Sequence, residues 1–119
     1  MSYKNIFSLE GKTALVVGAA SGIGRASSLG LADFGAHVIV ADQNLEGLNS
    51  VVQEIEASGG TAEAREVNLN DAASIHALLE SFEKLEVLVC TPAINVRKRI
   101  LDYSDEEFDK VVGLNLKGN

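Results

Sequence analysis

Three glycines lie close together in the stretch GAASGIG, residues 18–24, with the spacing G-x-x-x-G-x-G. The stretch joins a short apolar run to a segment with helical periodicity. A turn this tight needs residues without a Cβ, and the helix after it would direct N–H groups and partial positive charge at a diphosphate. The spacing departs from the G-x-G-x-x-G pattern of many dinucleotide sites. Tight strand-to-helix turns also use glycine for conformational reasons alone, so the loop by itself is weak evidence.

A carboxylate follows the next apolar run. Asp42 lies 18 residues after Gly24 (42 − 24), and an acid about 20 residues after such a loop can accept hydrogen bonds from both ribose hydroxyls. The alternative is a structural role in an Asx turn or helix cap, together with Asn44. The loop and the acid in combination predict dinucleotide binding. A carboxylate would repel a 2′-phosphate, and no Lys or Arg occupies 19–23 or 43–44; the sequence therefore favours NAD over NADP.

Strands and helices in alternation must position these groups. Near-continuous apolar runs at 12–17, 37–41 and 86–90 are typical of strands covered on both faces of a parallel sheet. The more polar run 61–67 predicts a strand nearer the sheet edge. Between the runs, apolar stripes at helical spacing predict three helices: Ile23, Ala26, Gly30 and Phe34, then Leu45, Leu48, Val52 and Ile55, then Ile75, Leu78, Leu79 and Phe82. This order predicts an α/β fold with a parallel sheet and right-handed crossovers.

A last helix begins at Ser104, where Glu107 completes a capping box. Its apolar stripe contains an amide, because Phe108, Val111, Val112 and Asn115 share one face. We expect Asn115 to be a buried amide that the complete fold satisfies with hydrogen bonds to backbone and water.

Bulk composition narrows the function classes. A chain of 119 residues, 46% hydrophobic and 23% charged, predicts one globular domain. A formal charge of −7 and a pI near 4.7 argue against nucleic acid or an anionic membrane as a partner. A single cysteine, Cys90, excludes an internal disulfide, and no apolar leader or membrane-spanning run is present; we expect a cytoplasmic protein. The carboxylates at 102–109 are joined by no His or Cys, so we expect no metal site.

These stretches together resemble the short-chain dehydrogenase/reductase family over essentially the whole chain. The matching segments are GKTALVVGAASGIGRA, VIVADQN, EVLVC with TPAIN after it, and LDYSDEEFDKVVGLNLKG. The resemblance implies a Rossmann-type parallel sheet of strand order 3-2-1-4, a truncated doubly wound fold in which residues 1–119 are the N-terminal, dinucleotide-binding half. It also implies NAD(P)-dependent oxidation of alcohols or reduction of ketones, on small-molecule substrates, by a homo-oligomer.

The resemblance assigns roles residue by residue. It places Gly18, Ser21, Gly22, Ile23 and Gly24 in the pyrophosphate loop and Asp42 at the adenosine ribose. Asn68 and Leu69 would lie beside the adenine, with an amide where the family usually has an acid. Cys90 and Ala93 bound a segment, Cys90-Thr91-Pro92-Ala93, that stands where the family usually has Asn-Asn-Ala-Gly beside the cofactor ribose. Pro92 lacks an N–H and Ala93 adds a methyl group, so cofactor affinity is the property these changes affect.

Asn115 matches the asparagine of the family's catalytic tetrad, which supports a water in the proton relay. The serine and the Tyr-x-x-x-Lys pair have no counterpart in residues 1–119, since Tyr3 is followed four residues on by Phe7 and Tyr103 by Glu107. We therefore expect no dehydrogenase turnover from these residues alone. We also expect poor stability or oligomerisation, because the strands missing from a half-fold would leave apolar area uncovered. The resemblance also suggests substrate binding by Asn95 and Arg97.

Two other interpretations remain open from the sequence. One is a non-catalytic nucleotide-binding or interaction module, in which the fourth strand becomes a sheet edge that can pair with another chain. The other is a methyltransferase-like nucleotide fold, where glycine loops followed by an acid also occur. The G-x-x-x-G-x-G spacing and the Asn-x-x-Gly at 115–118 speak against the second.

Overall fold

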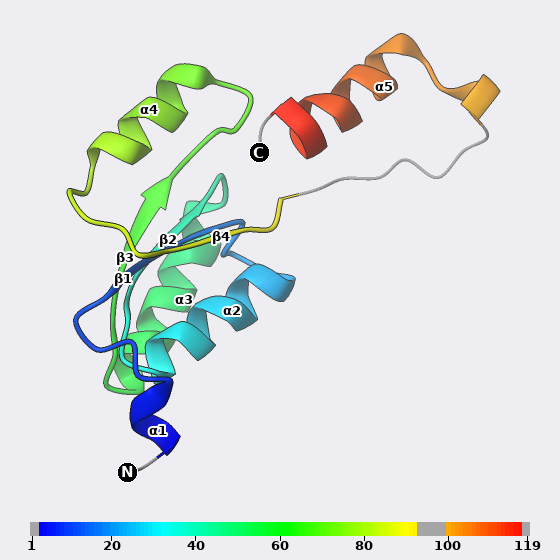
Figure 1. Cartoon of the computed structure of the whole chain (residues 1–119). Coiled ribbons are helices and arrows are strands. Elements are labelled where there is room, and N and C mark those ends of the chain that lie inside the picture. The colour runs from blue at the N-terminus through cyan, green and yellow to red at the C-terminus, as the bar shows by residue number, and fades with distance from the viewer. Residues whose placement is uncertain (1–2, 93–99, 118–119) are drawn as a thin grey trace.

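A four-stranded parallel sheet forms the centre of the molecule (Figure 1). The computed structural model describes residues 3–92 and 100–117. The strands run in the order β3-β2-β1-β4, and every neighbouring pair is parallel. Their bounds are β1 Thr13–Val17, β2 His37–Asp42, β3 Thr61–Glu66 and β4 Val87–Cys90. The predicted strands and the 3-2-1-4 order are confirmed, and β3 is the edge strand that its polar sequence indicated.

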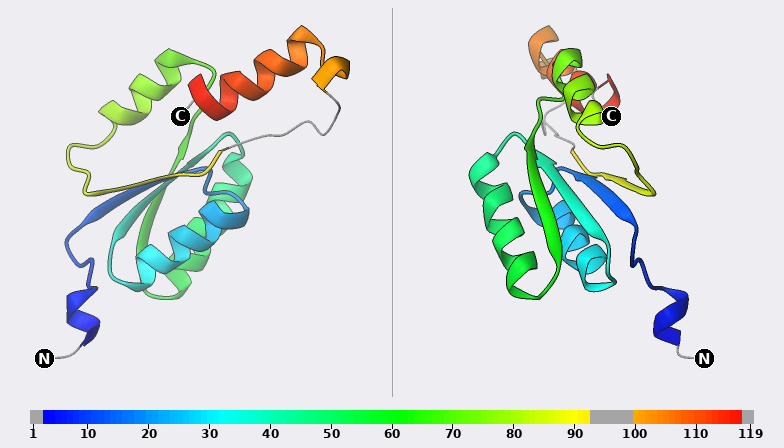
Figure 2. Two further views of the ribbon diagram at one scale, coloured as in Figure 1. Left: turned by 45° about the vertical axis from the view of Figure 1, so that its right-hand side comes forward. Right: turned by 90° about the vertical axis from the view of Figure 1, so that its left-hand side faces the viewer.

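Helices lie on both faces of this sheet. Their bounds are α1 Tyr3–Ile6, α2 Gly22–Asp33, α3 Leu45–Ala57, α4 Ala72–Glu80 and α5 Asp105–Val112, with a 3₁₀ turn η1 Ile100–Asp102 and a π-helical segment η2 Gly113–Lys117. Helices α2 and α3 cover one face, and α4 lies over the other, with α5 on the same side as α4 (Figures 1 and 2). The α/β class is therefore confirmed.

The strands β1 and β2 are buried on both faces, as their continuous apolar runs predicted. Val16 and Val38 point toward α2 and α3, where they pack in one cluster with Leu48 and Ile55. Their neighbours along the strands point the other way, and Leu15 belongs to a second cluster under α4. Burial of side chains this size contributes about 1.5–3 kcal/mol each. The two clusters fix β1 in the middle of the sheet.

The apolar stripe predicted for α2 is wrong. Ile23 and Phe34 are 77% and 51% exposed, and the buried residues of the helix are Gly24 and Ser28. The physical reason is close approach at the first turn: a Cβ on Gly24 would lie 2.0 Å from the carbonyl oxygen of Gly18, so no side chain fits at position 24. The Ser28 hydroxyl donates to the Gly24 carbonyl at 2.8 Å, which satisfies it in full burial.

The other stripes are confirmed in part. In α3, Leu48 and Ile55 are fully buried, whereas Leu45 is 43% exposed at the first turn. In α4, Leu78 is buried and Leu79 is 50% exposed. Each helix therefore buries a narrower stripe than the periodicity indicated.

The expectation of full coverage for β4 is also wrong, because Leu88 is 61% exposed and Cys90 is exposed. Strand β4 pairs with β1 alone among the described residues, so it is an edge. The capping box of α5 is confirmed at Ser104, but no residue of α5 is buried, and Phe108 is 57% exposed. Asn115 is exposed within η2, and its burial in the complete fold stays a prediction.

Candidate functional site

A cleft opens at the carboxyl end of β1. The chain leaves β1 toward β2 on one side, and returns much later to pair β4 on the other, so connections diverge at this point. Ligands of open parallel sheets bind in such a crevice. The cleft has a volume of ≈ 600 Å³, within the range of small-molecule sites. It is lined by Val17, Gly18, Ser21, Gly22, Ile23, Asp42, Gln43, Val67, Leu69, Thr91, Pro92 and Leu114.

The glycine loop forms one wall of this cleft. Gly18 has φ +86° and Gly22 has φ +58°, both in the left-handed region that side chains with a Cβ rarely adopt. The Gly18 N–H donates to the Ala41 carbonyl at 2.8 Å, which ties the loop to β2. The first hydrogen bond of α2 runs from the Arg25 N–H to the Ser21 carbonyl, at 3.2 Å. The N–H groups of the preceding residues lie in the first turn, where a helix supplies no acceptor, and such groups suit an anion.

Asp42 lies across the cleft from α2, at the end of β2. Its Oδ2 accepts a hydrogen bond from the Ala20 N–H at 3.2 Å, and its Oδ1 accepts from the Asn44 N–H at 3.1 Å. The second bond is the Asx turn that the structural interpretation predicted, and Asn44 caps α3 through the Gly47 N–H. Each carboxylate oxygen has a further lone pair, so the same group can also accept from a ribose. Asp42 therefore holds the loop and lines the cleft at once.

The end of β3 contributes an apolar wall. Val67 is buried and Leu69 is half-buried, and both line the cleft. Asn68 between them does not line it. Its N–H donates to the Ser74 hydroxyl at 2.9 Å, and its side-chain oxygen accepts from the Asn70 N–H at 3.0 Å. The Asn68 amide is thus engaged in the turn that leads to α4.

Three further predicted site residues, Gly24, Cys90 and Asn115, do not line the cleft. Gly24 is buried behind the loop, where it allows α2 to approach β1. Cys90 is exposed at the end of β4, and partial burial around its thiol raises the pKa of that group. A raised pKa keeps the thiol protonated and unreactive. Asn115 is exposed beside Leu114, which does line the cleft. Ala93, with Asn95 and Arg97, lies outside the described residues.

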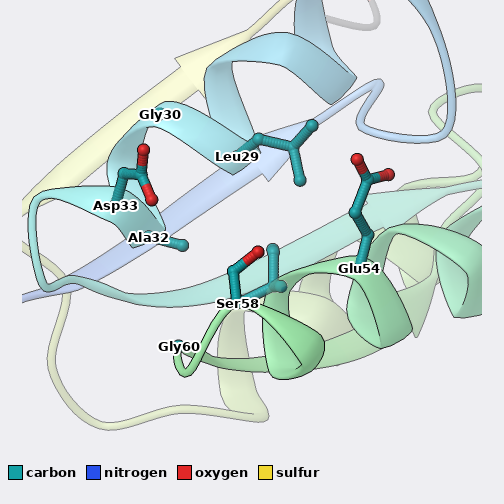
Figure 3. A pocket seen from close by; sticks show the side chains of 8 residues that line it. Leu29, Gly30, Ala32, Asp33, Glu54, Ser58 and Gly60 are labelled. Atoms are coloured by element: carbon teal, nitrogen blue, oxygen red, sulfur yellow. The ribbon is translucent and has the colours of Figure 1, made fainter.

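A second, smaller cavity of ≈ 190 Å³ lies between α2 and α3. Figure 3 shows Glu54 of α3 and Ser58, which follows the end of α3, on one side of this cavity and Leu29, Ala32 and Asp33 of α2 on the other. It contains none of the predicted site residues, and Glu54 already forms an ion pair with Arg25. The larger cleft is therefore the candidate site.

Neither a metal site nor a membrane span is found in the part of the chain that the structure describes. Residues 3–92 and 100–117 contain no cluster of three His, Cys, Asp or Glu side chains that could hold a metal ion. No helix within those residues is both long and apolar enough to cross a bilayer.

Comparison with known proteins decides the family. The family model described as short chain dehydrogenase matches residues 12–119. The chain belongs to the short-chain dehydrogenase family. The resemblance seen in the sequence is thus confirmed, and the methyltransferase-like interpretation is wrong.

Curated and solved relatives agree with this assignment. A 3-oxoacyl-[acyl-carrier-protein] reductase of Thermotoga maritima is 37% identical over 114 residues, covering 92% of this chain and 46% of that protein. A short-chain type dehydrogenase/reductase from Mycobacterium marinum superposes with a TM-score of 0.92 at 31% identity, covering 99% of this chain and 49% of the other. A 3-oxoacyl (acyl-carrier-protein) reductase from Agrobacterium tumefaciens C58 with NADP bound gives 0.90 at 31% identity, covering 99% and 47%. The chain spans about half the length of these relatives.

Some cleft residues of this short-chain dehydrogenase were missed from the sequence. Thr91 and Pro92 were noted only as departures from the family pattern, and Val67, Gln43 and Leu114 were not singled out. The available signal was position: Gln43 and Thr91 each follow directly after a strand that neighbours β1. At the carboxyl ends of parallel strands, the first residues past the strand face the ligand crevice.

Proposed function

We propose that residues 1–119 form the dinucleotide-binding half of an oxidoreductase that transfers hydride between NAD and a small alcohol or ketone. One observation carries the proposal: the glycine loop and the Asp42 carboxylate line the same cleft at the carboxyl end of β1. Gly22, Ile23 and the Ser21 hydroxyl would bind the pyrophosphate. Asp42 would accept hydrogen bonds from the adenosine ribose, and Leu69 would contact the adenine.

The cofactor supplies a hydride donor or acceptor when bound, and this chain's residues supply its binding. The fit rests on the glycine loop: Gly18 and Gly24 have no room for a Cβ, because Gly18 lies against Thr91 and Pro92 and Gly24 lies against Gly18, so no loop side chain at these two positions occupies the cleft. Cys90 and Ala93 would belong to the segment that runs beside the cofactor. Asn68 would support the cleft indirectly, by its hydrogen bonds in the turn before α4. Asn115 remains our candidate for holding a relay water.

The preference for NAD rests on charge. The residues that line the described cleft include the Asp42 carboxylate and no Lys or Arg, so a 2′-phosphate would meet repulsion without a compensating cation. Arg25, the nearest cation in sequence to the loop, pairs with Glu54 on α3. The reductase from Agrobacterium contains NADP, so the fold itself does not decide between the cofactors, and the side chains at 42 and 43 must.

Calorimetric titration tests the binding proposal. We expect NAD to bind at least about tenfold more tightly than NADP, because an unscreened charge repulsion of roughly 1.4 kcal/mol corresponds to that ratio. AMP should compete with NAD, since it occupies the adenosine part of the cleft. A folded protein that binds neither cofactor, or one that prefers NADP, would contradict the proposal.

Turnover should need groups beyond residues 1–119. The general acid/base tyrosine and its lysine have no counterpart in this stretch, and a positioned acid/base contributes about 10²–10⁴-fold to such a step. We expect the 119-residue chain to bind NAD without reducing it in the presence of simple secondary alcohols, as followed by NADH absorbance. Appearance of NADH at a rate typical of an enzyme would remove this expectation. A cytoplasmic location and homo-oligomeric assembly stay predictions from the sequence.

A further inference from the structure

Thr91 lies directly after β4, at the point where this strand meets the glycine loop. Val17 of β1 is in register with Cys90, so Thr91 lies beside the first residue of the loop. Its N–H donates to the Val17 carbonyl at 3.0 Å and continues the parallel ladder. Its hydroxyl oxygen lies 3.1 Å from the same carbonyl and 3.4 Å from that of Gly18. A threonine side chain thus contacts the two peptide groups from which the loop departs.

The same hydroxyl fills the space between two glycines. A Cβ on Gly18 would lie 2.4 Å from Thr91 Oγ1, and a Cβ on Gly24 would lie 2.9 Å from it. Gly18 begins the loop and Gly24 lies in the first turn of α2. The Thr91 hydroxyl is therefore close to both ends of the stretch 18–24. Both glycines can therefore lie close to the Thr91 hydroxyl only because they lack a side chain.

We propose that Thr91 is a positioning residue for dinucleotide binding: by donating its one hydroxyl proton to the carbonyl of Val17, or alternatively to that of Gly18, it holds the backbone of residues 18–24 in the conformation that receives the pyrophosphate. The proposal rests on the proposed function and adds a determinant of affinity to it. The hydroxyl carries one proton, and Val17 is the nearer acceptor, so the bond to Gly18 is the weaker of two alternatives. Thr91 and Pro92 also line the cleft, so the loop is fixed from the side on which the ligand binds.

Thr91→Val and Thr91→Ser separate the hydroxyl from the methyl group. Valine keeps the shape of threonine and removes the donor, whereas serine keeps the donor. We expect Thr91→Val to weaken NAD binding by about three- to tenfold, the range of one net hydrogen bond, and Thr91→Ser to stay within about twofold of wild type. Thr61→Val is the matched control, because the Thr61 hydroxyl bonds His37 Nδ1 at 2.8 Å, at the other end of the sheet. It should leave NAD affinity unchanged.

Amide hydrogen exchange of residues 18–24, measured without cofactor, tests the same proposal independently of NAD. Exchange in this stretch should be faster in Thr91→Val than in wild type, Thr91→Ser or Thr61→Val, while the exchange of β2 is the same in all four. If the wild-type protein binds no dinucleotide, the proposed function fails. The exchange measurement then still tests whether the Thr91 hydroxyl holds the loop backbone. Unchanged loop exchange in Thr91→Val, or equal effects of the valine and serine variants, would overturn the role of the hydroxyl.

Discussion

Gly24→Ala should abolish NAD binding and destabilise the fold more than any other single methyl addition in the loop. The new Cβ would lie 2.0 Å from the Gly18 carbonyl oxygen and 2.7 Å from its carbon. Both atoms are backbone, so no rotamer change relieves the clash. Either α2 moves away from β1 or the loop moves into the cleft, and each displacement misplaces the N–H groups that would receive the pyrophosphate.

The expected size follows from overpacking. Forcing a methyl group into a closed site costs roughly 1–3 kcal/mol and occasionally more, out of a total stability of about 5–15 kcal/mol. Urea denaturation should show this as a lower midpoint with an unchanged slope, and calorimetry should show no measurable heat of NAD binding. A Gly24→Ala protein with wild-type affinity would mean that the contact between α2 and β1 is looser than the structure shows.

Gly30→Ala is the matched control for this experiment. It adds the same methyl group to the same helix, at an exposed position where a Cβ meets nothing within 4 Å. Alanine is favoured over glycine inside a helix by up to about 1 kcal/mol, so this variant should be slightly more stable than wild type and bind NAD equally. Opposite signs from one chemical change would locate the effect at the contact of α2 with β1.

The contrast between these glycines also explains what the sequence could predict. The apolar runs of β1 and β2 correctly predicted burial on both faces, because the helices that cover these strands, α2, α3 and α4, are all part of the described structure. The face of α2 was predicted wrongly because the predicted stripe followed the large residues Ile23 and Phe34, whereas the two buried residues of the helix, Gly24 and Ser28, are small. Spacing cannot distinguish a glycine needed for close approach from one that is merely tolerated.

A similar limit applies to β4 and α5. Leu88 and Phe108 are large apolar residues of the kind that proteins usually bury, yet both are more than half exposed. Burial depends on which segments pack against a strand or helix, and the chain spans about half the length of its relatives. The same limit of sequence-based prediction applies to single atoms of the site. The spacing of Asp42 after the loop predicted its place in the cleft. Its hydrogen bond from the Ala20 N–H depends on the fold, which spacing does not describe.

Asp42→Ala should weaken NAD binding by roughly 10- to 100-fold, the range of a hydrogen bond to a charged group converted to affinity. The substitution also removes the acceptor of the Ala20 and Asn44 N–H groups, so stability should fall by about 1–3 kcal/mol. Asp42→Asn keeps one oxygen and can replace only one of these two bonds, so its loss of stability should be smaller. Asp33→Asn, which neutralises an exposed carboxylate outside the cleft, is the control and should change neither quantity.

The ratio of NAD to NADP affinity separates the two roles of Asp42. A displaced loop weakens both cofactors by the same factor, because both carry the same pyrophosphate. Loss of the carboxylate weakens NAD through its ribose and at the same time removes the repulsion against a 2′-phosphate, so it changes the ratio. Titration of Asp42→Asn with both cofactors should therefore show the preference for NAD reduced or lost, whereas Thr91→Val should weaken both equally. An unchanged ratio in Asp42→Asn would reduce Asp42 to the structural role of its Asx turn, and the choice of cofactor would have to be made elsewhere in the cleft.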